Sequence, residues 1–182
     1  MPHVITLPDE LFARLQAHAV PLVDTPLTII ERALAVLEAG DEDTNSSSHS
    51  AQSFNPGAAP NLAHTTPRKA IVAGKTLKAS ATYWNPVMFA VIREAAAQGV
   101  STADLMELIT VNCVLGEKSD HGYRFIGEAG LSVQGQDANA AWKQTYRIAS
   151  TVGVDVEIEF VWQDNEKAAM PNTLGSFYVG GK

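Results

Sequence analysis

The sequence predicts an α+β protein made of three consecutive parts. An alternating apolar run at residues 3–7, followed by two stretches with apolar residues at helical spacing, indicates a strand and two helices within residues 1–39. Residues 40–80 are rich in Ser, Asn, Ala, Gly and Pro, a composition typical of a flexible linker. Residues 81–182 combine helical patterns with short alternating strands, which predicts a small α+β domain there.

The first part is a strand followed by two helices. Residues 3–7 alternate between two faces, which is the period of a strand with one buried face. Pro8 ends the strand and suits the first turn of a helix, and the acidic residues after it complement the helix dipole. Pro26 begins a second helix, for which Asp24 or Thr25 provides the cap.

The N-terminal strand lacks a partner in the nearby sequence. A single strand leaves its backbone donors and acceptors unpaired, and even a two-stranded hairpin is only marginally stable in water. We therefore expect the partner strand to come from a second copy of the chain. The apolar faces of the strand and helices supply the expected homodimer contacts, which are Ile5, Leu7, Leu11, Leu15, Ile30, Leu34 and Leu37.

The stretch "VITLPDELFARLQAHAVPLVDTPLTIIERALAVLE" resembles the ribbon-helix-helix superfamily of bacterial dimeric regulators. Within it, the stretch looks most like the N-terminal module of the replication-initiation (origin sequestration) modulators. The resemblance implies two strands paired antiparallel across a two-fold axis with four helices beneath them. It also implies that the outward ribbon residues Val4 and Thr6 enter the DNA major groove, and that the start of the second helix, at Thr25, anchors phosphates. In the sequestration proteins the same module serves mainly for self-association.

The C-terminal end of the predicted linker is basic. "TPRKAIVAGKTLK" carries Arg68, Lys69, Lys75 and Lys78 around a small apolar centre. These cations suit an arm that lies on DNA phosphates. The alternative is a solvated linker end that happens to be basic.

The third part begins with two helices. Asn85 is the expected cap of the first, with Pro86 at its first position and Gly99 at its end. Ser101 and Asp104 form a near-capping box for the second. The pair has the order of a helix-turn-helix motif. Its second helix, however, offers acids where a recognition helix carries Arg, Lys, Asn or Gln, so an ordinary helical hairpin is the preferred interpretation.

An antiparallel sheet with one packed helix follows. "GYRFI" and "LSVQG" are expected to pair as a hairpin, "QDANAAWKQTYRIASTVG" to form a helix that ends at Gly153, and "LGSFYVGG" to form a last strand. In "VDVEIEFVW" the apolar residues share one face and the acids the other, which predicts a strand with one wet face. Trp142, on the helix, is expected to anchor the core.

The sequence offers no catalytic site, metal site or cofactor motif. Cys113 is expected to lie in the core, and nothing in its spacing from His121 favours an activated thiol. The histidines are scattered rather than spaced as zinc ligands. The acidic row of the strand "VDVEIEFVW", which is Asp155, Glu157 and Glu159, is expected to be its solvated side. The alternative is that these acids bind a cation or a basic partner.

Charge and composition limit the function. A net charge of -7 argues against a protein that coats nucleic acid indiscriminately. The single cysteine and the absence of a membrane or secretion signal lead us to expect a cytoplasmic protein, and the lack of a catalytic arrangement leads us to expect no enzyme activity. The sequence therefore predicts a dimeric DNA-associated regulator of transcription or replication, a class that includes antitoxin-like regulators. The alternative is a dimeric assembly module that binds a protein partner through its C-terminal domain and does not bind DNA.

Overall fold

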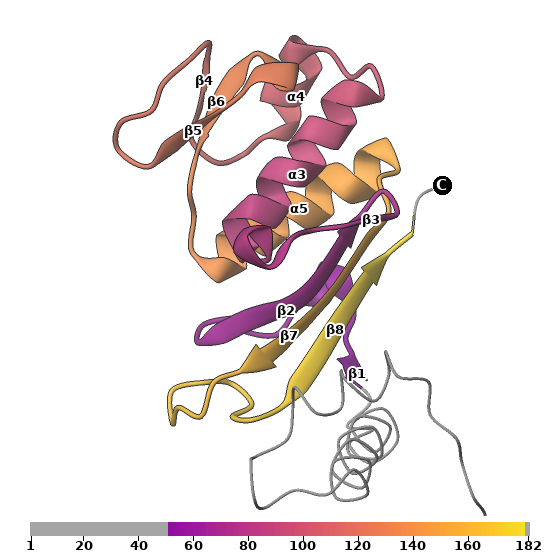
Figure 1. The fold of residues 1–182 in the computed structure, drawn as a ribbon, viewed down its shortest axis with the longest axis vertical. Coiled ribbons are helices and arrows are strands. Elements are labelled where there is room, and N and C mark those ends of the chain that lie inside the picture. The colour runs from indigo at the N-terminus through magenta and orange to yellow at the C-terminus, as the bar shows by residue number, and fades with distance from the viewer. Residues whose placement is uncertain (1–50, 181–182) are drawn as a thin grey trace, which may run out of the picture. The chain divides into compact units, whose positions relative to one another are not determined.

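A mixed five-stranded sheet is the base of the folded unit (Figure 1). The computed structural model describes residues 51–180, and the chain divides into two units between Ser48 and His49. The strand order is β1-β8-β7-β2-β3, with β1 parallel to β8 and the other neighbours antiparallel. These strands are β1 (Gln52–Ser53), β2 (Thr65–Val72), β3 (Lys75–Thr76), β7 (Val156–Trp162) and β8 (Leu174–Val179).

Two helices lie side by side on one face of this sheet, and a second, smaller sheet lies beyond them (Figure 1). The helices are α3 (Trp84–Ala97) and α5 (Ala138–Val152), and the short α4 (Thr102–Leu108) follows α3. The second sheet is antiparallel, with the order β4-β6-β5. Its strands are β4 (Cys113–Leu115), β5 (Tyr123–Ile126) and β6 (Leu131–Gln134); the 3-10 helices are η1 (Pro56–Ala58), η2 (Ala79–Ala81) and η3 (Gly127–Ala129). The predicted α+β class is confirmed for residues 51–180.

Several predicted elements are confirmed because their signals are local. β7 alternates strictly between buried and half-buried residues, as the apolar-acidic pattern predicts. The Asp137 side chain caps α5 by accepting from the N–H groups of Asn139 and Ala140, and Gly153 ends the helix in the left-handed conformation. β5 and β6 pair as the predicted hairpin.

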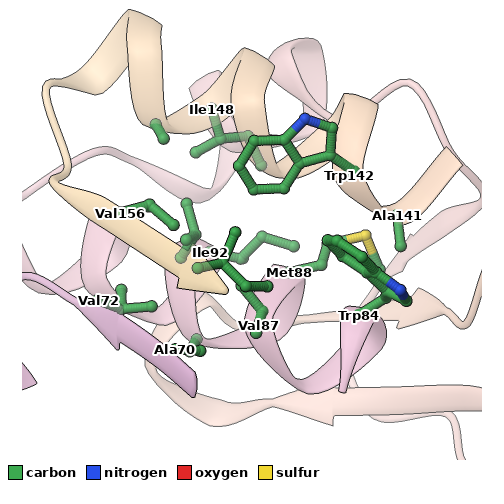
Figure 2. Close-up of a cluster of buried hydrophobic side chains, with 14 of the residues drawn as sticks. Ala70, Val72, Trp84, Val87, Met88, Ile92, Ala141, Trp142, Ile148 and Val156 are labelled. Carbon is green, nitrogen blue, oxygen red and sulfur yellow. The ribbon is translucent and has the colours of Figure 1, made fainter. Parts of the chain in front are cut away.

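The core fills the space between α3, α5 and the sheet. Figure 2 shows Trp84, Met88 and Ile92 of α3 facing Trp142 and Ile148 of α5, with the strand residues Ala70, Val72 and Val156 beside them. Trp142 is 2% exposed, which confirms its predicted place in the core. It stacks on Phe177 with ring centroids 4.4 Å apart, and further ring contacts join Phe54, Trp84, Phe160 and Trp162. This aromatic cluster fixes both helices to the sheet.

The prediction of a flexible linker over residues 40–80 is wrong for residues 52–80. That segment contributes three strands, and β2 lies between β3 and β7 in the sheet. Two indole groups hold its first half: Trp142 Nε1–H donates to the Pro56 carbonyl at 3.0 Å, and Trp162 Nε1–H donates to the Asn61 carbonyl at 2.9 Å. Asn139 accepts from the Leu62 N–H at 2.7 Å. The segment is ordered because distant residues supply these contacts, which composition does not reveal.

Three finer details also differ from the sequence predictions. The larger sheet is mixed, since β1 runs parallel to β8. α3 begins one residue before Asn85, so Tyr83 occupies the cap position. The Asn85 side chain instead donates to the Gln136 carbonyl at 2.9 Å and accepts from the Gln136 N–H at 2.8 Å, which ties α3 to the start of α5. The predictions for residues 1–39 lie outside the described residues.

Candidate nucleic-acid interface

A β-bulge in β2 separates the two basic residues at its centre. Pro67 lies opposite Phe160 of β7 and Lys69 lies opposite Glu159, so Arg68 is the extra residue between two successive pairs. A bulge of this kind redirects a side chain relative to its neighbours. Lys69 stands among the acids of β7, whereas Arg68 lines a hollow beside Tyr83. Adjacent cations of the predicted basic segment therefore serve different surfaces.

Three hollows lie in series around the first turns of α3, and we call them together the α3 groove. The first, of about 230 Å³, shares Thr66, Pro67 and Tyr83 with the second, of about 370 Å³. The second shares Pro86 with the third, of about 330 Å³. Because neighbouring hollows share lining residues, they adjoin one another around the start of α3. Besides the shared residues the lining is Thr65, Arg68, Leu77, Ala79, Ser80, Ala81, Thr82, Trp84, Asn85, Phe89, Ala90, Arg93, Arg124, Gln136, Ala138 and Gln163.

The charge of the α3 groove is positive. Arg68 lines its first hollow, Arg93 and Arg124 line its third, and exposed Lys78 stands on the segment between them. Within residues 51–180, Arg68, Lys78 and Arg124 are in no ion pair, while Arg93 contacts Glu128 at 3.2 Å. No Asp or Glu is among the described residues that line the three hollows. A concave surface with unneutralised cations and no carboxylates concentrates a positive potential.

An exposed aromatic ring stands where the first two hollows meet. Tyr83 is 55% exposed and makes no side-chain capping hydrogen bond at the start of α3. Trp84, directly after it, is 7% exposed and donates from Nε1 to Thr65 Oγ1 at 3.0 Å. The buried Trp84 thus fixes the start of the helix and leaves the Tyr83 ring at the surface.

The structure brings together some of the predicted cations and disperses others. Lys69 Nζ lies 3.3 Å from Glu157 Oε1 and 3.7 Å from Glu159 Oε1, on the sheet face that carries the acidic row. Lys75 Nζ lies 3.4 Å from Glu94 Oε2. Arg68 and Lys78 alone of the four belong to the α3 groove or its margin. Val4, Thr6, Thr25 and the predicted dimerisation residues lie outside the described part of the chain.

Sequence reasoning missed Tyr83, Arg93 and Arg124 as members of a site. Arg124 lies on β5, more than thirty residues after α3 begins, and reaches the third hollow only because the smaller sheet packs against that helix. The signal in the sequence was weak: a tyrosine at a helix cap position, where Ser, Thr, Asp or Asn is usual.

The residues considered for catalysis are not assembled into a reactive centre. Cys113 is half-buried on β4 rather than fully buried, and burial raises the pKa of its thiol, which favours the less nucleophilic form. His121 Nδ1 lies 2.9 Å from Asp120 Oδ2 in an exposed loop. Among residues 51–180, no three His, Cys, Asp or Glu side chains gather closely enough to hold a metal ion.

Within the same residues, no helix has the length and apolar character needed to cross a bilayer. Comparison of the chain with protein-family models, curated proteins and solved structures gave no match. The resemblance of residues 4–38 to the ribbon-helix-helix superfamily therefore stays a prediction from sequence.

Proposed function

We propose that the chain is a dimeric DNA-associated regulator of transcription or replication whose folded C-terminal unit contacts phosphates through the α3 groove. The observation that carries the proposal is the grouping of Arg68, Lys78 and Arg124 around a depression without carboxylates, in a chain of net charge -7. In so acidic a protein, a surface of this sign is a local exception. Phosphate contacts of Lys and Arg supply most of the sequence-independent affinity for nucleic acid.

The distribution of charge also orients the proposed contact. The acids Glu157 and Glu159 point to the opposite face of the sheet from α3 and α5, where Lys69 partly neutralises them. Nucleic acid is repelled from that face and attracted to the α3 groove. The charges of the two surfaces therefore favour the approach of nucleic acid to the α3 groove and not to the acidic face of the sheet.

The N-terminal residues complete the proposal. Residues 1–39 pair two copies of the chain, as their resemblance to ribbon-helix-helix proteins implies, and each dimer then carries two α3 grooves. Two linked binding sites raise the overall affinity well beyond that of one. Sequence readout by Val4 and Thr6 with phosphate anchoring at Thr25 belongs to the same proposal, although the ribbon offers no Arg, Lys, Asn or Gln to discriminate bases.

The test compares two double variants with the same loss of charge. Arg68→Gln with Arg124→Gln removes the cations of the α3 groove, whereas Lys143→Gln with Lys167→Gln removes two cations elsewhere that form no ion pair within residues 51–180. Fluorescence anisotropy with genomic DNA fragments at low salt is expected to show weaker binding for the first variant only. Equal affinities for both variants would contradict the placement of the contact.

The assembly module is the second candidate function, and one surface favours it. The face of the five-stranded sheet opposite α3 and α5 carries no helix within residues 51–180, and Tyr178 is 63% exposed there. Such a face suits a protein partner. No binding of the unmodified chain to DNA or RNA at low salt would favour this candidate over the regulator.

A further inference from the structure

We infer that the α3 groove binds single-stranded nucleic acid, with an unstacked base against Tyr83, a neighbouring phosphate on Arg68 and a phosphate farther along the strand on Arg124. The inference rests on the proposed function, because it names the form of nucleic acid that the same groove takes. It follows from the shape of the groove, from the exposed ring at its centre and from the position of the cations.

The shape of the groove favours a flexible strand over a duplex. Its first hollow, of about 230 Å³, lies between Arg68 of β2 and Tyr83 at the start of α3. A duplex keeps its bases stacked inside, so its outer phosphates can contact the groove but its bases do not reach the Tyr83 ring. An unpaired base can turn out of its strand and enter, as bases do in proteins that recognise single-stranded regions.

Tyr83 provides the surface on which a base can stack. Tyr83 is 55% exposed, whereas Trp84, Phe160 and Trp162 are almost wholly buried. The ring contributes no capping hydrogen bond to α3, so the fold gains little from a tyrosine at this position. Every base has a π-face, and stacking on aromatic side chains is therefore the usual source of sequence-tolerant affinity for single strands.

Cations line the first and third hollows of the groove, and Tyr83 lies where the first and second hollows meet. Arg68 lines the same hollow as Tyr83, and Pro86 connects the second hollow to the third, where Arg124 lies. Lys78 stands between the residues Leu77 and Ala79, which line the third and first hollows. Basic groups that follow a groove with an aromatic ring between them are typical of proteins that bind single strands.

The discriminating substitution is Tyr83→Ser, because it removes the ring while supplying a better helix cap. Serine at an N-cap position usually stabilises a helix relative to residues that cannot accept the N–H bond, so this variant is expected to fold at least as well as the parent. Tyr83→Phe keeps the ring. Tyr178→Ser, which removes another exposed tyrosine from β8 on the other side of the sheet, is the matched control.

The experiment measures the affinity of the full chain and these variants for a thymidine oligonucleotide of about 20 residues and for a duplex of the same length, at low salt. For Tyr83→Ser we expect roughly tenfold weaker binding of the single strand, with duplex binding changed by no more than about twofold. Tyr83→Phe and Tyr178→Ser are expected to bind the single strand like the parent. A Tyr83→Ser protein that keeps its single-strand affinity, or loses both affinities equally, would overturn the inference and leave the proposed function in place. A parent chain that binds neither nucleic acid would overturn the proposed function itself.

Discussion

Replacing Trp142 with phenylalanine tests whether residues 54–62 belong to the folded unit. The substitution removes the indole N–H that donates to the Pro56 carbonyl at 3.0 Å, together with two carbon atoms that are buried in the core. A neutral hydrogen bond contributes about 1 kcal/mol, and two buried carbons contribute about 1.6 kcal/mol at roughly 0.8 kcal/mol each. We therefore expect the free energy of unfolding to fall by about 2.5 kcal/mol. The remaining phenyl ring can still stack on Phe177, so the loss should stay below that of a truncation to alanine.

Chemical denaturation measures this loss, because Trp84 and Trp162 remain as fluorescent reporters of the folded unit. Tyr178→Phe is the control, since its ring is largely exposed and its hydroxyl donates no hydrogen bond within residues 51–180; its stability should match that of the parent. Hydrogen exchange provides the second readout, with faster exchange expected for residues 56–62. A loss below about 0.5 kcal/mol, with unchanged exchange there, would refute the role given to the indole contact.

Two further predictions concern packing and assembly. Gly175→Ala places a methyl group 2.8 Å from Phe160 Cζ and 3.0 Å from Phe54 Cε2, so thermal denaturation should show a loss of stability of about 1–3 kcal/mol. Ser176→Ala, on the other face of β8, is the control and should change stability by less than about 0.5 kcal/mol. Equal effects of the two substitutions would mean that the Phe160 ring can move aside. Sedimentation of the full chain at micromolar concentration should show a dimer, while Leu34→Asp and a chain that starts at Ala51 should be monomeric; a dimeric Leu34→Asp protein would contradict the predicted pairing of residues 1–39.

The elements that could be predicted from the sequence are those whose signals lie within a few residues. The alternation of β7 and the caps of α5 at Asp137 and Gly153 each identify an element without reference to the rest of the chain. The pairing of β5 with β6 follows from the short turn between them. β5 and β6 belong to the smaller sheet, and β7 and α5 belong to the larger sheet and the helices that cover it.

β2 could not be predicted for the opposite reason. Pro67 and the bulge at Arg68 interrupt its alternation, and its only buried residues besides Pro67 are the small Ala70 and Val72. Its partner β7 lies far along the chain, as the 88-residue separation between Lys69 and Glu157 illustrates. A strand stabilised by such a distant neighbour carries little local signal.

The candidate site was predictable in part. The cluster of cations at residues 68–78 drew attention to Arg68 and Lys78, but the sequence did not reveal that Lys69 and Lys75 face glutamates. Tyr83 meets Arg68 only because the start of α3 packs beside β2, and Arg124 reaches the groove only because the smaller sheet packs on α3. The site is therefore a product of tertiary structure more than of any motif.

The salt dependence of binding tests the proposed phosphate contact of the α3 groove most directly. Each phosphate contact to a single strand contributes about -0.7 to the slope of log K against log salt concentration. Replacing Arg68 and Arg124 with glutamine should therefore make the slope for a thymidine oligonucleotide shallower by about 1.4 for each groove engaged, while the Lys143→Gln, Lys167→Gln control keeps the slope of the parent. Identical slopes for the two double variants would contradict the account, because the arginines of the α3 groove would then make no phosphate contact.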